Sequence, residues 1–271
     1  MNATVIAAPV RTPVHTPIPN VCANCETPRM GEYCYACGQH FLEGRLTIGR
    51  LARDFIVRKL GLEGGLLRTA SELTMRPHTM IRQYVDGRRQ RYTNPVAYLL
   101  LMAALYVLLS GMWTPAMEAG FRSELGEEGA EMEAMVQVQL WMDGHPALST
   151  MILCLFVVPA LSLLFRRTTT TAEASVFALY VSGHLLLMQA VINVAAVALS
   201  ADVYRMMTGR ITGIAILVLL FSAGRFFGTR FTSYLKVAVA LAISAFGVFV
   251  LMVVAAVVLA ALAAAAPAAS L

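Results

Sequence analysis

Four cysteines near the start of the chain are the residues best suited to chemistry. They form two close pairs, Cys22 with Cys25 and Cys34 with Cys37, in the order Cys-x2-Cys-x8-Cys-x2-Cys. Two residues between thiols let both sulfurs of a pair reach one metal ion, and four thiolates leave no open coordination position. The pattern therefore predicts a minimal zinc ribbon over residues 22–40, with structural Zn2+ as its cofactor.

Other chemistries use the same ligands. Iron in a rubredoxin-like site is the main rival, because four thiolates alone do not exclude it. A redox-active cysteine pair fits less well, since two pairs so close together suit one metal better. His40 could replace a cysteine as ligand, although four thiols already complete the shell. A closed site performs no reaction, so its function would lie in the surface that the metal holds rigid.

The rest of the chain has the composition of a membrane protein. Of its 271 residues 58% are hydrophobic and 14% are charged, whereas about 25% are charged in a typical soluble domain. The fold we expect is an all-α polytopic membrane protein with about five transmembrane helices, an N-terminal zinc ribbon and amphipathic interfacial helices. A span needs roughly 20 apolar residues, and the apolar runs are 95–113, 147–165, 174–200, 210–224 and 236–265.

The residues before the first span divide into three parts. Residues 1–21 are expected to be a disordered leader, and residues 22–40 form the ribbon. Residues 41–94 are expected to form amphipathic basic helices at the membrane surface. Apolar residues at helical spacing predict one such helix over 46–60 and another from about Leu66.

Proline and asparagine mark the next helix boundaries. Pro77 suits the first turn of a short helix, which Asp86-Gly87 would end. Asn94 is a plausible N-cap for the first span, with Pro95 at its first helical position. The bundle then occupies residues 95–271 and includes an acidic outer loop, 114–146, in which a short helix would lie across the outer face.

The distribution of positive charge predicts the orientation. If the N-terminus is cytoplasmic, 18 of the 21 Lys and Arg residues lie on the cytoplasmic side and 3 lie outside. Cytoplasmic loops carry an excess of Lys and Arg, so the N-terminus is predicted to be inside and the C-terminus outside. Trp113 and Trp141 fall near the predicted outer boundary, where aromatic residues gather.

Arginines are dense just before the first span. An anionic-lipid or partner-binding role is predicted for Arg76, Arg82, Arg88, Arg89 and Arg91. A zinc ribbon with arginines also suits nucleic acid, but the nearest polyanion here is the layer of anionic headgroups. Nucleic acid is therefore the less favoured partner. Interfacial anchoring by these arginines with Tyr84 and Tyr92 explains the stretch without a dedicated ligand.

The segment after the ribbon also carries a motif, L-x-T-x3-L-x3-P-x3-I-x2-Y-x2-G-x-R-x2-Y-x2-P. It runs through Leu67, Thr69, Leu73, Pro77, Ile81, Tyr84, Gly87, Arg89, Tyr92 and Pro95. With the preceding CxxC and CxxCGQ runs, it resembles the bacterial zinc-ribbon inner-membrane proteins of the domain-of-unknown-function family 3667. The resemblance covers roughly residues 22–105 and implies a bacterial inner (cytoplasmic) membrane protein, with the N-terminus cytoplasmic and the C-terminus periplasmic. It implies no biochemistry.

Polar residues inside spans are candidates for function. The third span holds Ser175, Ser182, Gln189, Asn193 and Ser200 on one face, with His184 nearly opposite. From this span Ser182, His184, Gln189 and Asn193 are the intramembrane polar candidates. Such a stripe could line a substrate path, but polar residues more often hydrogen-bond neighbouring helices. His184 is expected to be a satisfied histidine of the bundle rather than a proton relay.

No catalytic motif is present: the chain lacks HExxH, GxSxG and a phosphate-cradling glycine-rich loop. The function expected is that of a non-enzymatic adaptor or regulator, whose ribbon platform binds a protein partner or anionic lipid. The alternative is a transporter or lipid-handling protein that uses the polar face of the third span. A membrane enzyme has the weakest support. A homo-oligomer is compatible with either of the first two.

Overall fold

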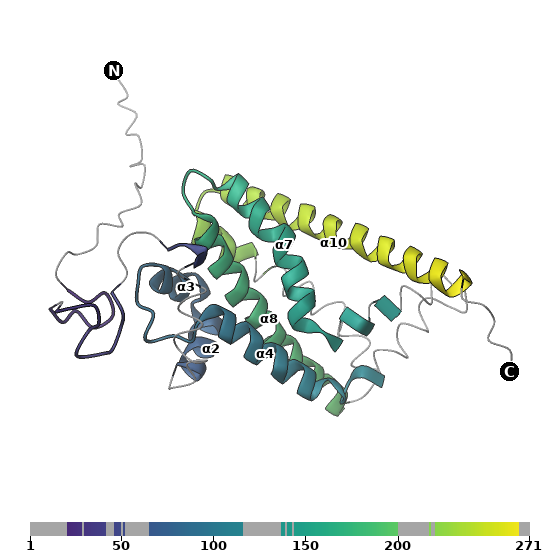
Figure 1. Cartoon of the computed structure of the whole chain (residues 1–271), viewed down its shortest axis with the longest axis horizontal. Coiled ribbons are helices and arrows are strands. Elements are labelled where there is room, and N and C mark those ends of the chain that lie inside the picture. Colours follow the sequence, from purple (N-terminus) through teal and green to yellow (C-terminus); the bar gives the residue numbers. More distant parts are fainter. Residues whose placement is uncertain are drawn as a thin grey trace, which may run out of the picture.

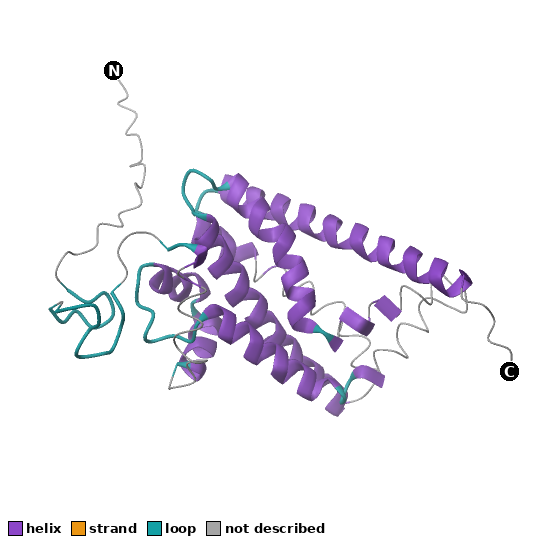
Figure 2. Cartoon of the chain, in the orientation of Figure 1, coloured by secondary structure: helices purple, strands orange, loops and turns teal. Residues whose placement is uncertain are grey.

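The structure, a computed structural model, describes residues 21–28, 30–41, 46–49, 51, 65–115, 137–138, 140–142, 144–199, 217 and 220–265. Within these residues the chain is helical and has no strand, and the cysteine segment consists of loops and turns with two isolated bridges (Figure 2). The predicted leader up to residue 20 lies outside the described residues. So do most of the helix expected over 46–60, most of the outer loop and most of the fourth apolar run.

Within residues 65–94, two short helices precede the bundle. Helix α2 spans Leu66–Met75 and helix α3 spans Pro77–Val85. Arg76 between them leaves the helical region, with φ −145° and ψ 58°, because the residue before a proline is disfavoured in α conformation. Gly87, with φ +107°, turns the chain after α3 as the Asp86-Gly87 pair predicts.

Helix α4 spans Pro95–Ser110 and begins where the sequence places it. The Asn94 side chain accepts a hydrogen bond from the Val96 backbone N–H at 2.9 Å, and Pro95 occupies the first helical position. The side-chain oxygen satisfies one of the backbone donors that the first helical turn leaves unpaired. The predicted N-cap of the first apolar run is therefore confirmed.

Among the described residues, three helices are long and apolar enough to cross a membrane: α7 at Pro146–Leu164, α8 at Thr171–Leu199, and the part Phe231–Val258 of α10. Helix α10 itself runs over Phe231–Ala265 and has 35 residues. Helix α4 is apolar but has only 16 residues. The prediction of a helical membrane protein is supported, and the number of five spans stays a prediction.

The long helices pack in a row, with α4 against α8, α8 against α7, and α7 against α10 (Figure 1). The starts of α4, α8 and α10 lie at one end of the bundle together with α2 and α3, and the end of α7 joins them there. Lys236 near the start of α10 donates to the Leu164 carbonyl at the end of α7, at 3.2 Å. We call this the ribbon end, because the cysteine segment lies beyond it.

A tyrosine layer fastens α3 to the bundle at the ribbon end. The rings of Tyr84 and Tyr180 meet edge to face at 5.4 Å between centroids, and Tyr98 lies 6.0 Å from Tyr180. All three are almost fully buried, and the Tyr180 hydroxyl donates to the Thr93 carbonyl at 2.5 Å. Buried tyrosine hydroxyls need such partners. This contact holds the chain just before α4 against α8.

Helices α4 and α8 are in close contact at Gly183. A Cβ atom placed there would lie 3.0 Å from the Leu99 Cα atom and 3.1 Å from the Tyr98 ring. We expect Gly183→Ala to push the two helices apart, because a backbone atom cannot move aside alone. Overpacking of this kind costs about 1–3 kcal/mol, so the unfolding midpoint in detergent should fall by several degrees.

The control for this prediction is Gly111→Ala. Gly111 follows α4 with φ −55°, and nothing lies within 4 Å of its would-be Cβ. The Gly111→Ala variant should leave the unfolding midpoint unchanged or slightly raised. Equal midpoints for the Gly183 and Gly111 variants would show that α4 and α8 do not pack as described.

Candidate metal centre

The cysteine segment contains two turns of the same backbone form, whose residue numbers differ by 12. In the first, Cys22 N–H donates to the Thr27 carbonyl and Glu26 N–H donates to the Cys22 carbonyl, both at 2.8 Å. In the second, Cys34 N–H donates to the Gln39 carbonyl and Gly38 N–H to the Cys34 carbonyl, again at 2.8 Å. A backbone bridge closes each turn, between Val21 and Pro28 and between Tyr33 and His40. We call them the first and second knuckles.

The residue after each cysteine pair adopts a left-handed conformation. Gly38 has φ +68° and Glu26 has φ +63°. Glycine accepts this conformation freely, whereas a residue with a Cβ is disfavoured by roughly 1–2 kcal/mol. The first knuckle is therefore intrinsically the more strained of the two.

The four sulfurs converge on one point. All four Sγ atoms lie within 4.8 Å of one another, with Cys22 and Cys37 at 3.7 Å and Cys25 and Cys34 at 3.5 Å. A tetrahedral zinc ion with Zn–S bonds of about 2.3 Å separates its sulfurs by about 3.8 Å. The cluster thus fits one metal ion, to which each knuckle would supply two thiolates. His40 is not among the residues of this cluster, and its ring instead meets the Tyr33 ring edge to face at 4.8 Å.

The environment of the thiols is uneven. The Thr27 hydroxyl lies 3.2 Å from the Cys25 sulfur, and its hydrogen bond lowers the pKa of Cys25 to about 6. Burial raises the pKa of Cys37 to about 12. Metals bind the thiolate, so a bound ion must displace the Cys37 proton, while Cys25 is already ionised at neutral pH.

The Gln39 side chain attaches the second knuckle to the bundle. Its Nε2 donates to the Gly87 carbonyl at 2.6 Å, and its Oε1 accepts from the backbone N–H groups of Arg89 and Gln90, both at 3.3 Å. The side chain is buried. One amide therefore bonds to three backbone groups of the turn between α3 and α4, two of which, the Arg89 N–H and the Gly87 carbonyl, also bond to each other at 3.0 Å.

The first knuckle also contacts this turn. A Cβ on Gly87 would lie 3.2 Å from the Ala23 Cβ, so the close approach and the positive φ both favour glycine there. Arg88 Nη2 lies 3.8 Å from the Glu26 carboxylate, an exposed ion pair of the kind that contributes about 0–1 kcal/mol. Both knuckles thus lie against residues 87–90.

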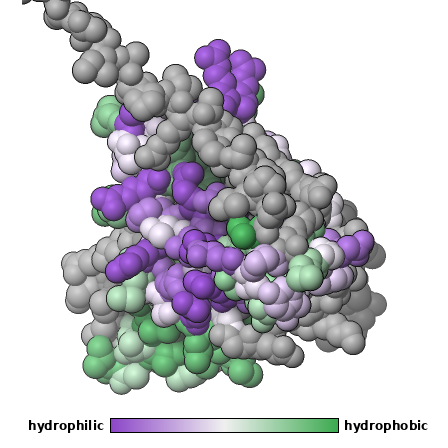
Figure 3. All heavy atoms as spheres, turned by 90° about the vertical axis from the view of Figure 1, so that its left-hand side faces the viewer, coloured by the Kyte–Doolittle hydropathy of each residue, from purple (hydrophilic) through white to green (hydrophobic). Residues whose placement is uncertain are grey.

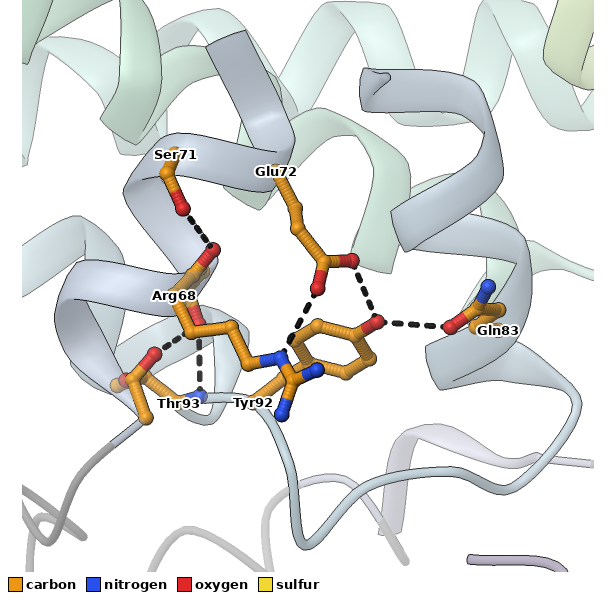
Figure 4. Close-up of polar contacts among 8 residues, drawn as sticks. Arg68, Ser71, Glu72, Gln83, Tyr92 and Thr93 are labelled. Carbon is orange, nitrogen blue, oxygen red and sulfur yellow. Dashed lines mark hydrogen bonds and ion pairs between the residues drawn. The ribbon is translucent and has the colours of Figure 1, made fainter. Parts of the chain in front are cut away.

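A partly buried polar network holds that turn against α2. The Tyr92 hydroxyl lies 2.7 Å from Glu72 Oε2 and 2.7 Å from Gln83 Oε1 (Figure 4). Both oxygens accept, so the single phenol proton is shared between them. Arg68 donates to the other Glu72 oxygen at 2.9 Å.

This network shifts two pKa values. Burial alone would raise the pKa of Glu72, but the hydrogen bonds from Tyr92 and Arg68 outweigh it and hold that pKa below its usual value. Burial, together with the bond to Glu72, raises the pKa of Tyr92 to about 12. Glu72 is therefore a structural acceptor rather than a proton donor at neutral pH.

Thr69 is the second buried link from α2 to the chain before α4. It is fully buried, donates to the Gly65 carbonyl at 2.7 Å and accepts from the Thr93 N–H at 3.0 Å (Figure 4). Its hydroxyl therefore uses both its donor and an acceptor site within the protein.

The five arginines predicted to bind lipid or a partner lie in different surroundings. Arg76 and Arg91 are exposed. Arg88 faces Glu26, and Arg89 is only 6% exposed, with its guanidinium 5.9 Å from the Tyr84 ring centroid. Arg82 donates through Nη2 to the Phe226 carbonyl. Arg88, Arg89 and Arg82 thus have intramolecular contacts that the sequence did not indicate.

His184 links three helices. Its Nδ1 lies 3.0 Å from the Tyr98 hydroxyl and its Nε2 lies 3.2 Å from the Thr74 hydroxyl. Thr74 already donates to the Ala70 carbonyl, so it must accept from Nε2–H, and Nδ1 then accepts from Tyr98. A neutral Nε2–H imidazole satisfies every bond. This arrangement is that of a satisfied histidine in a bundle.

The other polar candidates of α8 lie further along the helix. Gln189 Nε2 donates to Asn193 Oδ1 at 2.9 Å, and Asn193 is buried. Ser182 is half-buried beside Cys154 of α7. Sequence reasoning singled out these residues but missed Gln39, Thr69 and Glu72. The Cys-Gly-Gln run was visible, yet nothing local shows which turn the glutamine meets.

The fold and the site together define a helical membrane protein whose four-cysteine cluster is docked on the turn before α4. Residues 63–107 match the model of the family described as Protein of unknown function (DUF3667), which confirms the resemblance drawn from the motif. The match takes in α2, α3 and most of α4, the segment that receives the knuckles. No curated protein and no solved structure matches the chain.

We expect Gln39→Leu to loosen the knuckles from the bundle while leaving the sulfurs in place. The variant removes three hydrogen bonds to the turn and takes the Gln39 partner from the Gln90 N–H, a loss that costs about 1–3 kcal/mol. The Arg89 N–H and the Gly87 carbonyl keep their bond to each other. Hydrogen exchange of the Gln90 amide should therefore become about tenfold faster or more. Gln90→Leu is the control, because its exposed side chain takes no part in these bonds. Unchanged exchange in Gln39→Leu would contradict the docking.

Proposed function

We propose that the protein is a non-enzymatic membrane adaptor or regulator whose ribbon, residues 22–40, binds a protein partner. The observation that carries this proposal is the combination of a docked base with an exposed outer surface. Gln39 fixes one side of the ribbon against residues 87–90. Met30, Tyr33 and Tyr35 remain 70%, 53% and 66% exposed.

The chemistry of that surface favours protein over lipid. Tyrosine and methionine are enriched in protein interfaces, where a rigid aromatic side chain gains contact area at low entropic cost. The ribbon itself carries Glu26, Arg29 and Glu32, a net charge of −1, so anionic headgroups would not be attracted to it. Anionic lipid is the partner expected for the arginines near α3 and α4 instead.

The metal in the proposal is zinc. Four thiolates in a closed tetrahedral set are the usual ligands of structural zinc, and the metal would supply the folding free energy that so small a segment lacks. The Cys154 thiol lies on α7, outside the cluster. It therefore provides an internal control for the metal assignment.

We expect the purified chain to carry about one zinc per molecule and Cys34→Ser to lose most of it. Removing one of four thiolates opens the shell and weakens tetrahedral binding. Elemental analysis of the detergent-purified protein measures the outcome. Cys154→Ser should keep its zinc. One iron per chain, or the same metal content in both variants, would overturn the zinc assignment.

The proposed location is a bacterial inner membrane, with the ribbon end cytoplasmic and the C-terminus periplasmic. The division of Lys and Arg, 18 against 3, supports this orientation. Helices α4, α8 and α10 all start at the ribbon end, so their starts would share one side of the membrane with the ribbon (Figure 1). Labelling of a cysteine introduced at Tyr35 from either side of intact cells would check it.

A transporter or lipid-handling role is less favoured by the geometry. Gln189 and Asn193 bond to each other, and His184 bonds to Thr74 and Tyr98. Side chains whose bonds are made inside the bundle act as links between and along helices. The adaptor is therefore the function proposed.

Photo-crosslinking tests the adaptor. A photoreactive amino acid in place of Tyr35, in the full chain in its native membrane, should give one discrete protein adduct. The yield of this adduct should fall several-fold when Met30→Ser and Tyr33→Ser are also present. The zinc content of that variant should stay normal. The same reagent at Leu108 on α4, which is 79% exposed, is the control and should label lipid. Lipid adducts alone at Tyr35 would contradict the proposal.

A further inference from the structure

A second set of functional groups lies at the ribbon end, away from the ribbon surface. It brings together α3 and the helical stretch 220–227 that precedes α10. Arg82 donates to the Phe226 carbonyl, and its guanidinium carbon lies 5.3 Å from the Phe226 ring centroid. Arg225, the neighbour of Phe226, is exposed and lies 4.6 Å from the Phe221 ring centroid. Residues 143 positions apart thus place two guanidinium groups in one region.

His78 completes this set from α3. It lies one turn before Arg82 on the same helix. Burial and the positive charges of Arg225 and Arg82 lower the pKa of His78, which shows that both arginines are near its ring. Its Nδ1 atom is buried and has no hydrogen-bond partner in the described part of the chain. We call His78, Arg82 and Arg225 the cationic cluster.

Within the described residues, none of the three members of the cationic cluster forms an ion pair. Helix α3 has no acidic residue in its first turn and no side chain capping that turn, and the residue before it is Arg76. The amino end of a helix attracts anions through its dipole and its free N–H groups. At the start of α3 Pro77 has no N–H, and the Thr79 and Met80 N–H groups both donate to the Arg76 carbonyl, so the dipole is the main attraction that this helix end adds to the cluster.

The cluster lies over a layer of aromatic rings. Phe165 stacks on Phe227 at 4.6 Å and Phe177 stacks on Phe226 at 5.1 Å, which joins α7, α8 and the stretch 220–227. Lys236 also lies above this layer, 5.5 Å from the Phe165 ring centroid. Cations above buried aromatic rings at the ends of apolar helices are typical of the depth where lipid headgroups begin. Hydrophilic side chains gather on this end of the molecule (Figure 3).

We propose that His78, Arg82 and Arg225 bind the phosphate group of an anionic membrane lipid. Arg82 and Arg225 supply charge and N–H donors to the phosphate oxygens, and the His78 ring supplies a further donor. His78 and Arg225 were not among the residues the sequence predicted for lipid. The lipid site uses none of the ribbon surface. A negative result in the cross-linking test of the adaptor would therefore leave the proposal of a lipid site unaffected.

The test is a lipid titration of the full chain purified in detergent. Phosphatidylglycerol is added and the fraction of lipid-bound protein is read by native mass spectrometry. The double variant His78→Gln, Arg225→Gln should bind about tenfold more weakly. It keeps the Arg82 contact with Phe226, so α3 stays attached. Arg230→Gln is the matched control: it removes one charge from an exposed position outside the cluster and should change affinity less than about twofold.

Two further titrations distinguish a lipid phosphate from free inorganic phosphate. Phosphatidylcholine, which has no net charge, should bind at least about tenfold more weakly than phosphatidylglycerol. Inorganic phosphate should compete only at much higher concentration. Equal binding of inorganic phosphate would assign the site to a free anion and overturn the lipid. An unchanged affinity in the double variant, or an equal loss in Arg230→Gln, would overturn the cluster.

Discussion

The arrangement of the front half of the molecule depends on one side-chain amide. Gln39 offers a donor and an acceptor to a turn that presents both a carbonyl and N–H groups to it. The backbone at such a turn must find partners when it is covered, and an amide can serve both kinds of group at once. A segment with almost no core of its own thereby gains a fixed position against the bundle. The metal cluster fixes the shape of the segment, and Gln39 fixes its place.

Behind the turn, polar contacts continue into the bundle. Thr69 joins α2 to Thr93, whose carbonyl accepts from Tyr180 of α8. Tyr92 joins α2 and α3 through Glu72 and Gln83. The matched family segment, 63–107, contains most of these groups. Its polar motif residues are thus accounted for by architecture, since they pair with one another instead of facing an open site.

Local signals in the sequence predicted the elements well. Asn94 with Pro95 predicted the start of α4, Pro77 predicted the start of α3, and the apolar runs predicted α7 and α8 within a few residues. The cysteine spacing predicted the cluster. These features are set by neighbours in the chain, through caps, turns and periodicity, so a sequence displays them directly.

Long-range partners were not predictable in the same way. The contact of Gln39 with residues 87–90 joins groups about 50 positions apart, and that of Arg82 with Phe226 spans 144. Proximity to the bilayer suggested that the arginines before α4 face lipid, yet Arg89 is buried. Charge alone does not show whether a guanidinium finds a ring or a carbonyl inside the protein. That depends on packing between elements, which no local pattern encodes.

The unequal lengths of the apolar helices have a consequence for the surrounding bilayer. At 1.5 Å per residue, the 16 residues of α4 extend about 24 Å, which is less than a hydrocarbon core of about 30 Å. Lys236 lies at the level of the headgroups, so the part of α10 inside the hydrocarbon runs from Val237 to Val258 and extends about 33 Å, close to that thickness. Hydrophobic mismatch is therefore confined to one flank of the molecule, where we expect the lipid beside α4 to be thinned.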